Sequence, residues 1–190
     1  MISSPIFDQK LNLGRVAESY VAKWLQVKYG YSILPVYDKH FTTEEENNGR
    51  KKGPQFFTAT GAYAAPDMLC MRDNRLCWVE AKCKSTFTWR RINQQWQDGI
   101  DLHHYQQYCA IADTVPWPIH IMFLHLDTWN PIACRDAPEP SAAGLFGNRL
   151  DILRANEDHQ DMRHGRYGMV YWNKSILCRY ATLDEVLAVV

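Results

Sequence analysis

The stretch APDMLCMRDNRLCWVEAKCK, residues 65–84, contains two apolar runs separated by an Asp-Asn pair at 73–74. Asp and Asn are favoured in tight turns, so the pattern predicts two antiparallel β-strands joined by a short turn. Asp67 stands at the start of the first run, and Glu80 and Lys82 lie within the second. These three polar residues interrupt apolar strands, and the fold and the chemistry of the chain are predicted from them.

The alternation of side chains along a strand determines which residues of the second run share a face. Glu80, Lys82 and Lys84 point to one side of the strand, and Ala81 and Cys83 point to the other. Burying carboxylates and an ammonium on apolar strands is costly unless a divalent cation and a phosphate complete the charge balance. The pattern therefore predicts a metal-dependent phosphodiesterase site.

This arrangement resembles the PD-(D/E)xK nuclease superfamily, which has the restriction-endonuclease-like fold. The residues that carry the resemblance are Pro66-Asp67 and Glu80-Ala81-Lys82, in a strand–turn–strand context between two predicted helices. As a text pattern the motif is common, so the facing of the strands and the flanking helices give it its weight. The resemblance implies an α/β protein with a restriction-endonuclease-like core, in which a central mixed β-sheet is flanked by α-helices.

An amphipathic helix is expected before the motif, over residues 11–29, with Gly30 as its stop. Glu18 falls at the border of the apolar stripe of this helix, from which it could reach the edge of the sheet. The pattern from Gly14 to Tyr31 resembles the first helix of archaeal-type Holliday junction resolvases, which carries a further acidic residue toward the metal site. The resemblance makes Glu18 a fourth catalytic candidate, and the alternative is a solvated glutamate on a helix flank.

A second helix is expected after the motif, with Asp101 as its N-cap. RecB-like nucleases carry Gln-x-x-x-Tyr on the corresponding helix. No glutamine of this chain has a tyrosine four residues on, and the nearest match runs from His104 to Tyr108. This departure argues against a close relation to that subfamily.

Several polar residues around the motif are candidates for contacts with nucleic acid. Arg90 and Arg91 follow Trp89, and cations beside aromatic rings are common on nucleic-acid-binding surfaces. Solvation or ordinary packing is the alternative for each candidate. The full set of candidates is Lys84, Arg90, Arg91, Gln106, Lys51 and Lys52.

Composition limits the class of protein. The 21 basic residues balance 21 acidic ones, so there is no global positive field of the kind that marks many nucleic-acid binders. The 190 residues fit one domain, expected over residues 1–190, with loop insertions near 38–64 and 134–166. Any contact with DNA must therefore come from local patches of charge.

The cysteines and the hydropathy of the chain indicate a cytoplasmic protein. Six cysteines are scattered without a Cys-x-x-Cys pair, as expected for core thiols in a reducing compartment. No segment approaches the roughly 18 apolar residues of a membrane span, and the first residues contain no apolar signal segment.

The rest of the chain is expected to complete the sheet. Residues 31–37 and 118–126 have the composition of strands, and the second of these is expected to be central. Residues 135–148 are expected to form a loop, and residues 168–172 and 176–180 a closing hairpin.

The resemblance also implies a cofactor and a reaction. A hard cation prefers oxygen ligands, so Mg²⁺ or Mn²⁺ is expected on Asp67 and Glu80, with the backbone carbonyl of Ala81 as a further ligand. Lys82 would position the attacking water or stabilise the developing negative charge. The expected activity is hydrolysis of DNA phosphodiester bonds by an endonuclease, either junction-resolvase-like or restriction-like, which could act as a homodimer.

Two alternatives remain open from the sequence. The chain could be a nucleic-acid-binding or assembly module that keeps the fold without using the site. The motif could also be accidental, in which case the chain is a different α/β enzyme.

Overall fold

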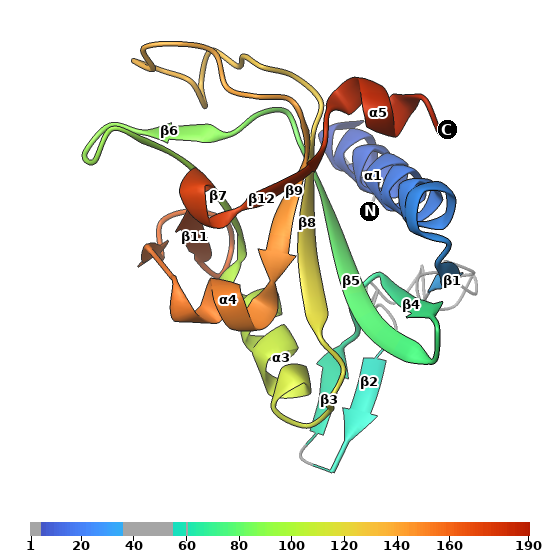
Figure 1. Ribbon diagram of the computed structural model, residues 1–190. Helices are drawn as coiled ribbons and strands as arrows, with labels where there is room; N and C mark the ends of the chain where they lie inside the picture. Colours follow the sequence, from blue (N-terminus) through green and yellow to red (C-terminus); the bar gives the residue numbers. More distant parts are fainter. Residues whose placement is uncertain (1–4, 36–54, 60) are drawn as a thin grey trace.

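The computed structural model describes residues 5–35, 55–59 and 61–190. A central sheet has the order β1-β4-β5-β8-β9-β12, in which β5 and β8 are parallel and the other neighbours antiparallel (Figure 1). The expected central mixed sheet is thereby confirmed. Its strands are β1 (Ser32–Pro35), β4 (Met68–Arg72), β5 (Arg75–Lys84), β8 (Ile119–His125), β9 (Gly144–Arg149) and β12 (Cys178–Ala181).

A second, antiparallel sheet packs beside the central one. Its strand order is β10-β11-β7-β6, and a separate pair of strands, β2 and β3, forms a small hairpin. The strands of the second sheet are β6 (Thr88–Arg90), β7 (Gln95–Asp101), β10 (His159–Asp161) and β11 (Met169–Asn173), and the hairpin consists of β2 (Gln55–Thr58) and β3 (Gly61–Ala64).

Helices cover both faces of the central sheet, as expected (Figure 1). One face packs against α1 and α5 through a core that includes Val21, Trp24 and Val186. The other face packs against α3, α4 and the inner side of the second sheet. The helices are α1 (Pro5–Tyr29), α3 (Leu102–Ala112), α4 (Leu150–Ala155) and α5 (Leu183–Leu187), with a 3₁₀ turn, η1 (Lys174–Ile176).

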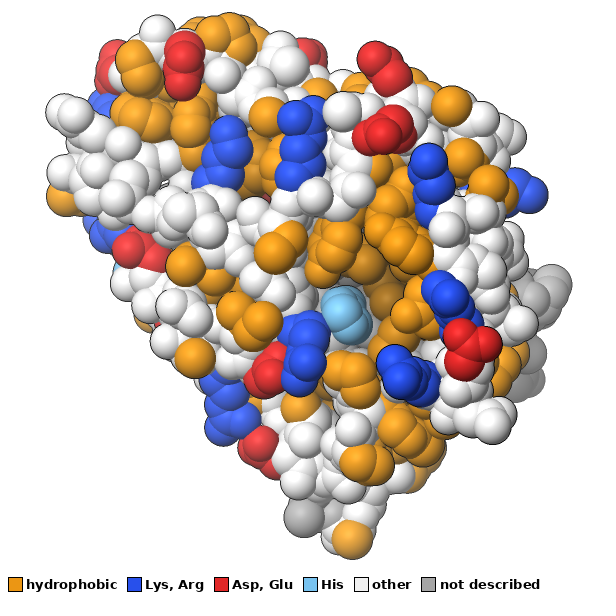
Figure 2. All heavy atoms as spheres, in the orientation of Figure 1, with side chains coloured by type: hydrophobic (Ala, Val, Ile, Leu, Met, Phe, Trp, Pro, Cys, Tyr) orange, Lys and Arg blue, Asp and Glu red, His pale blue; other side chains and the backbone are white. Residues whose placement is uncertain are grey.

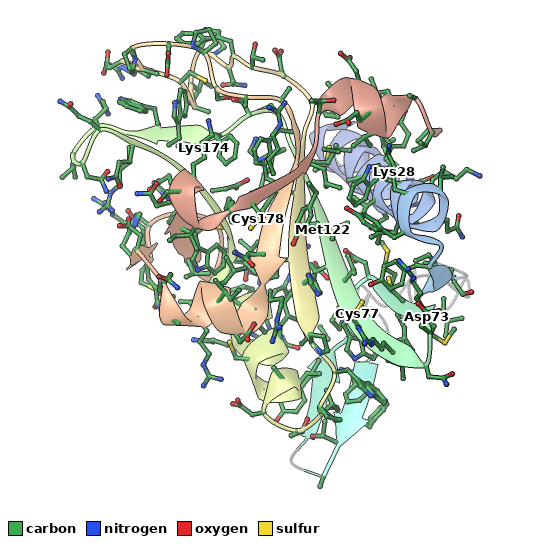
Figure 3. The ribbon with its side chains drawn as sticks, in the orientation of Figure 1. Lys28, Asp73, Cys77, Met122, Lys174 and Cys178 are labelled. Atoms are coloured by element: carbon green, nitrogen blue, oxygen red, sulfur yellow. The ribbon has the colours of Figure 1, made fainter. Side chains whose placement is uncertain are left out.

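The motif strands form the predicted hairpin. Asp73 and Asn74 both have positive φ, at 49° and 58°, which is the backbone of a two-residue type I′ turn (Figure 3). The predicted facing is also confirmed, because Val79 and Ala81 pack toward α1 while Trp78 packs into the opposite core. The turn therefore sets the register that brings the start of β4 beside the middle of β5.

The predicted N-cap of α3 and the predicted end of α1 at Tyr29 are confirmed, whereas α1 begins at Pro5 and not at residue 11. The Asp101 side chain accepts a hydrogen bond from the His103 amide at the start of α3. At α5, Thr182 and Glu185 form a capping box, each side chain accepting from the backbone of the other. In the described residues, no helix combines the length and the apolar character that crossing a membrane requires.

The closing hairpin predicted at 168–180 is wrong. β11 pairs with β7 and β10, whereas β12 pairs with β9 in the central sheet. Val170 and Trp172 of β11 are fully buried in the core between the two sheets. The 3₁₀ turn η1 therefore carries the chain from one sheet to the other instead of closing a hairpin.

The loop predicted at 135–148 is partly wrong, because its last residues begin β9. Gly147 in this strand allows close packing, because a Cβ there would lie 2.2 Å from the Ile121 carbonyl oxygen of β8. All six cysteines are free, but the expectation of core thiols holds fully only for Cys70 and Cys134, because Cys178 is exposed and the other three are half-buried.

The turn that sets the register can be tested by substitution. Asn74→Val should lower the free energy of unfolding by about 1–2 kcal/mol, because a β-branched residue is strained at positive φ. Asn74→Gly should leave it unchanged or slightly higher, because glycine suits a type I′ turn. Equilibrium urea unfolding measures both, and a valine variant as stable as the wild type would contradict this turn.

Candidate active site

Two carboxylates meet where β4 begins beside β5. The Asp67 amide donates to Glu80 Oε2 at 3.2 Å, and the Ala81 amide donates to Asp67 Oδ2 at 2.8 Å. Asp67 is 8% exposed and Glu80 only 1%. These reciprocal hydrogen bonds hold both side chains in place, so the two acidic residues of the motif form one buried pair.

The charge of this pair is poorly compensated. Burial raises the pKa of Asp67 well above its usual range, and the negative charge of Glu80 raises it further. Lys82 opposes that rise, while Glu18 on α1 adds to it. Glu18 therefore lies near enough for its charge to raise the pKa of Asp67.

Lys82 lies at the border between the pair and solvent. Its ammonium forms an ion pair with Glu80 Oε1, and its side chain is 29% exposed. One lysine beside two carboxylates leaves a net negative charge at a site with several carboxylate oxygens, which suits a hard divalent cation. Among the described residues, however, no three or more His, Cys, Asp or Glu side chains lie close enough together to hold one metal ion.

His104 on α3 lies within electrostatic range of Glu80 and Lys82. Burial lowers the pKa of His104, Lys82 lowers it further, and Glu80 acts in the opposite direction. The imidazole is therefore mostly neutral at neutral pH, when it can both donate and accept a hydrogen bond. The sequence indicated His104 only through its place in an incomplete Gln-x-x-x-Tyr match.

The Lys84 ammonium binds groups of the protein itself and is not placed to bind a phosphate. Its Nζ donates to the Gly99 carbonyl oxygen at 2.8 Å and lies 3.4 Å from Asp98 Oδ1. His125 Nε2 lies 2.7 Å from the other Asp98 oxygen, and both His125 and Asp98 are buried. This polar network ties β5 and β8 of the central sheet to β7 of the second sheet.

Asp98 is charged within this network. Burial alone would raise the pKa of Asp98, but the charge of Lys84 and the hydrogen bond with His125 together hold it below its usual value. Asp98 and His125 were missed as a pair in the sequence, because they are 27 residues apart and neither belongs to a motif.

The other predicted nucleic-acid contacts are dispersed. Arg90 forms an ion pair with Asp158, and Arg91 lies 3.2 Å from Asp136. Gln106 is exposed on α3. Lys51 and Lys52 lie outside the described residues. The structure thus brings together Asp67, Glu80, Ala81 and Lys82, with Glu18 nearby, and places Arg90 and Arg91 on the second sheet and the loop after it.

Comparisons with known proteins find similarities to solved structures. No protein-family model and no curated protein matches the sequence. The chain is similar to a Holliday junction resolvase, Hjc, from the archaeal hyperthermophile Archaeoglobus fulgidus, with 9% identity, a TM-score of 0.47, and coverage of 86% of this chain and 90% of that one. It is also similar to a nuclease from a fusselovirus, with 10% identity, a TM-score of 0.41, and coverage of 100% and 95%. Both of these proteins are nucleases.

The carboxylate pair should cost stability when no cation is present. In EDTA, Asp67→Asn should raise the free energy of unfolding by about 1–2 kcal/mol, because it removes a buried charge beside Glu80 and keeps an oxygen for the Ala81 amide. Asp151→Asn, at an exposed ion pair with Arg149, is the control and should change it by less than about 0.5 kcal/mol. Urea unfolding checks both, and a destabilised Asp67→Asn would contradict the like-charge arrangement.

Removing a charge from the polar network between the sheets should, in contrast, destabilise the fold. Asp98→Ala should lower the free energy of unfolding by about 2–3 kcal/mol, because it leaves Lys84 and His125 without their shared acceptor. Asp113→Ala removes an exposed partner of Arg154 and serves as the matched control. Equal effects of the two substitutions on thermal unfolding would show that the Asp98 network contributes no more than a surface pair.

Proposed function

We propose that this protein is a metal-dependent nuclease that hydrolyses DNA phosphodiester bonds as an endonuclease. The observation that carries the proposal is the buried pair of Asp67 and Glu80, joined by reciprocal backbone hydrogen bonds, with Lys82 beside it at the solvent border. A pair of like charges buried together destabilises the fold, so its presence favours a role in binding a cation. The choice of DNA and of internal cleavage follows from the resemblance of the motif to that of PD-(D/E)xK nucleases.

Mg²⁺ or Mn²⁺ is the cofactor that these residues suit. Asp67 and Glu80 would supply carboxylate oxygens, and Ala81 its backbone carbonyl. When bound, such a cation supplies positive charge to the scissile phosphate and makes water a better nucleophile at neutral pH.

The remaining residues of the site would orient the reacting groups. Lys82 is anchored at one end by Glu80 and is partly exposed, so its Nζ can donate to a phosphate oxygen or to the attacking water. His104, which is mostly neutral and whose pKa responds to the charges of Lys82 and Glu80, can hold a water by accepting a hydrogen bond from it. Glu18 adds negative charge at the helix edge, which strengthens attraction for a cation.

The surface charge supports binding through local contacts. Figure 2 shows the molecule from the same side as Figure 1. On the described part of that side, Lys and Arg side chains are dispersed among hydrophobic ones, in agreement with the zero net charge. A single copy would therefore gain little non-specific affinity from long-range attraction. Pairing of two copies would double the contacts and place two sites on one substrate, which favours a homodimer for paired cuts.

Cleavage of defined substrates tests the proposal. With Mg²⁺, the protein should relax or linearise supercoiled plasmid, and comparison with a four-way junction, linear duplex and single strand identifies the preferred form. Asp67→Asn, Glu80→Gln and Lys82→Met should each reduce the single-turnover rate by about 10²-fold or more, because each removes a ligand or a charge donor from the reacting phosphate.

Lys23→Met, on the exposed side of α1, is the matched lysine control and should cleave like the wild type. Cleavage that persists in EDTA, or full activity in both Asp67→Asn and Lys82→Met, would overturn the mechanism. Binding of every substrate without turnover would instead favour a nucleic-acid-binding module that keeps the fold without using its site.

A further inference from the structure

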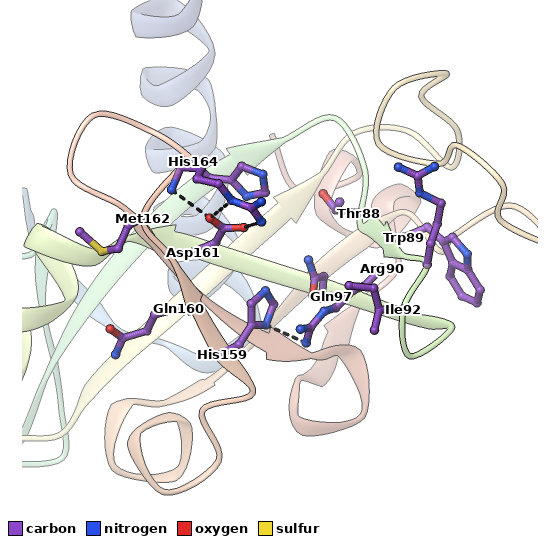
Figure 4. A pocket seen from close by; sticks show the side chains of 12 residues that line it. Thr88, Trp89, Arg90, Ile92, Gln97, His159, Gln160, Asp161, Met162 and His164 are labelled. Carbon is purple, nitrogen blue, oxygen red and sulfur yellow. Dashed lines mark hydrogen bonds and ion pairs between the residues drawn. The ribbon is translucent and has the colours of Figure 1, made fainter.

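A cavity of about 620 Å³ lies on the outer face of the second sheet, between the β6–β7 hairpin and the segment that follows β10 (Figure 4). Its volume falls within the range of about 300–1,000 Å³ that is usual for small-molecule sites. The pairing of β6 with β7 places Thr88 and Gln97 side by side on its floor. None of the residues of the candidate active site lines it.

Gln97 is the polar group that the cavity leaves unsatisfied. Its side chain is 5% exposed, and its Oε1 has no hydrogen-bond partner anywhere in residues 5–35, 55–59 and 61–190. A buried amide oxygen without a partner costs free energy and calls for an explanation. Because Oε1 itself is shielded, a ligand with an N–H donor would remove that cost by bonding to it once the amide rotates toward the cavity that Gln97 lines.

The charged residues of the cavity argue against a bare anion as the ligand. Each arginine that lines it is paired with an aspartate: Arg90 with Asp158, Arg91 with Asp136 and Arg163 with Asp161. The cavity therefore has little uncompensated positive charge. A neutral group that forms hydrogen bonds would fit it better than inorganic phosphate.

The walls of the cavity suit a flat, partly apolar ligand. Ile92 and Met162 line it and are 90% and 67% exposed, and Figure 4 places them on opposite sides of Gln97. The His159 ring also lines it and is stacked on Tyr171, with 4.8 Å between centroids and 12° between planes. Stacked and apolar side chains around a hydrogen-bonding floor are features that bind aromatic heterocycles.

Tyr171 has a fixed position under His159. A Cβ at Gly99 would lie 2.7 Å from the Tyr171 ring, so the ring lies directly over this glycine of β7. The Tyr171 hydroxyl is also 2.7 Å from His164 Nδ1, which lines the cavity. The stacked His159 ring is thus supported from below and is preorganised for a ligand.

We propose that this cavity binds one unpaired nucleobase of a DNA strand, through a hydrogen bond to Gln97 and contact with His159, Ile92 and Met162. Every base carries an N–H donor, which complements the Gln97 oxygen, and a flat face, which complements the apolar and stacked side chains of the cavity. The assignment to a strand rests on the proposed nuclease function, whereas recognition of a base rests on the cavity alone. A base captured here would require single-stranded, frayed or branched DNA.

Anisotropy of fluorescein-labelled oligonucleotides in EDTA tests the proposal without cleavage. The wild type should bind a short single strand about tenfold more tightly than an abasic strand with the same phosphates. Gln97→Met, which keeps the length of the side chain and removes its polar atoms, should lose about tenfold for the single strand and nothing for the abasic strand. Its stability to urea should equal or exceed that of the wild type, since an unsatisfied group is removed.

Gln95→Met is the matched control, because Gln95 lies two residues away on the same face of β7, is exposed and does not line the cavity. It should bind both strands like the wild type. Equal binding of the single strand by Gln97→Met and the wild type would overturn the proposal. Displacement of the strand by inorganic phosphate would overturn recognition of a base, and displacement by a free nucleotide with equal affinity would overturn the role of the strand.

These outcomes are separable from failure of the nuclease proposal. Base-dependent binding that needs Gln97, in a protein that cleaves nothing, would support the cavity and overturn the nuclease. Mg²⁺-dependent cleavage in a protein whose binding ignores Gln97 would do the reverse.

Discussion

The two reciprocal hydrogen bonds between Asp67 and the middle of β5 are the constraint on which the site depends. They place one buried carboxylate against another, at a cost in electrostatic free energy that the surrounding apolar core must exceed. The hairpin turn at Asp73 and Asn74 sets the register that makes both bonds possible. The arrangement proposed for the chemistry therefore lowers the stability of the fold, which is typical of functional sites.

The sequence predicted this part of the fold well because its signals are local. The turn, the facing of β5, the cap of α3 and the place of β8 all follow from residues close together in the chain. The closing hairpin failed because β11 and β12 are neighbours in sequence, while their partners β7 and β9 are distant. The same limit hid Asp98, His125 and Gln97, whose environments exist only after the two sheets pack together.

The second sheet gives the candidate nuclease site its surroundings. Its inner side supplies Asp98, which fixes Lys84 and joins the two sheets, and its outer side holds the cavity with Gln97 on the floor. One strand, β7, thus contributes alternate residues to a structural network and to a binding surface. A nuclease of this design would have its chemistry on the central sheet and a contact for an unpaired base on the sheet beside it.

The central claim is that Asp67 and Glu80 are held together to bind a divalent cation. Anomalous diffraction from crystals soaked in Mn²⁺ tests it most directly, because the signal locates the ion itself. One anomalous peak within about 2.5 Å of oxygens from both carboxylates is the predicted result. Well-diffracting soaked crystals without a peak at the pair, or with Mn²⁺ bound only at other carboxylates, would contradict the claim.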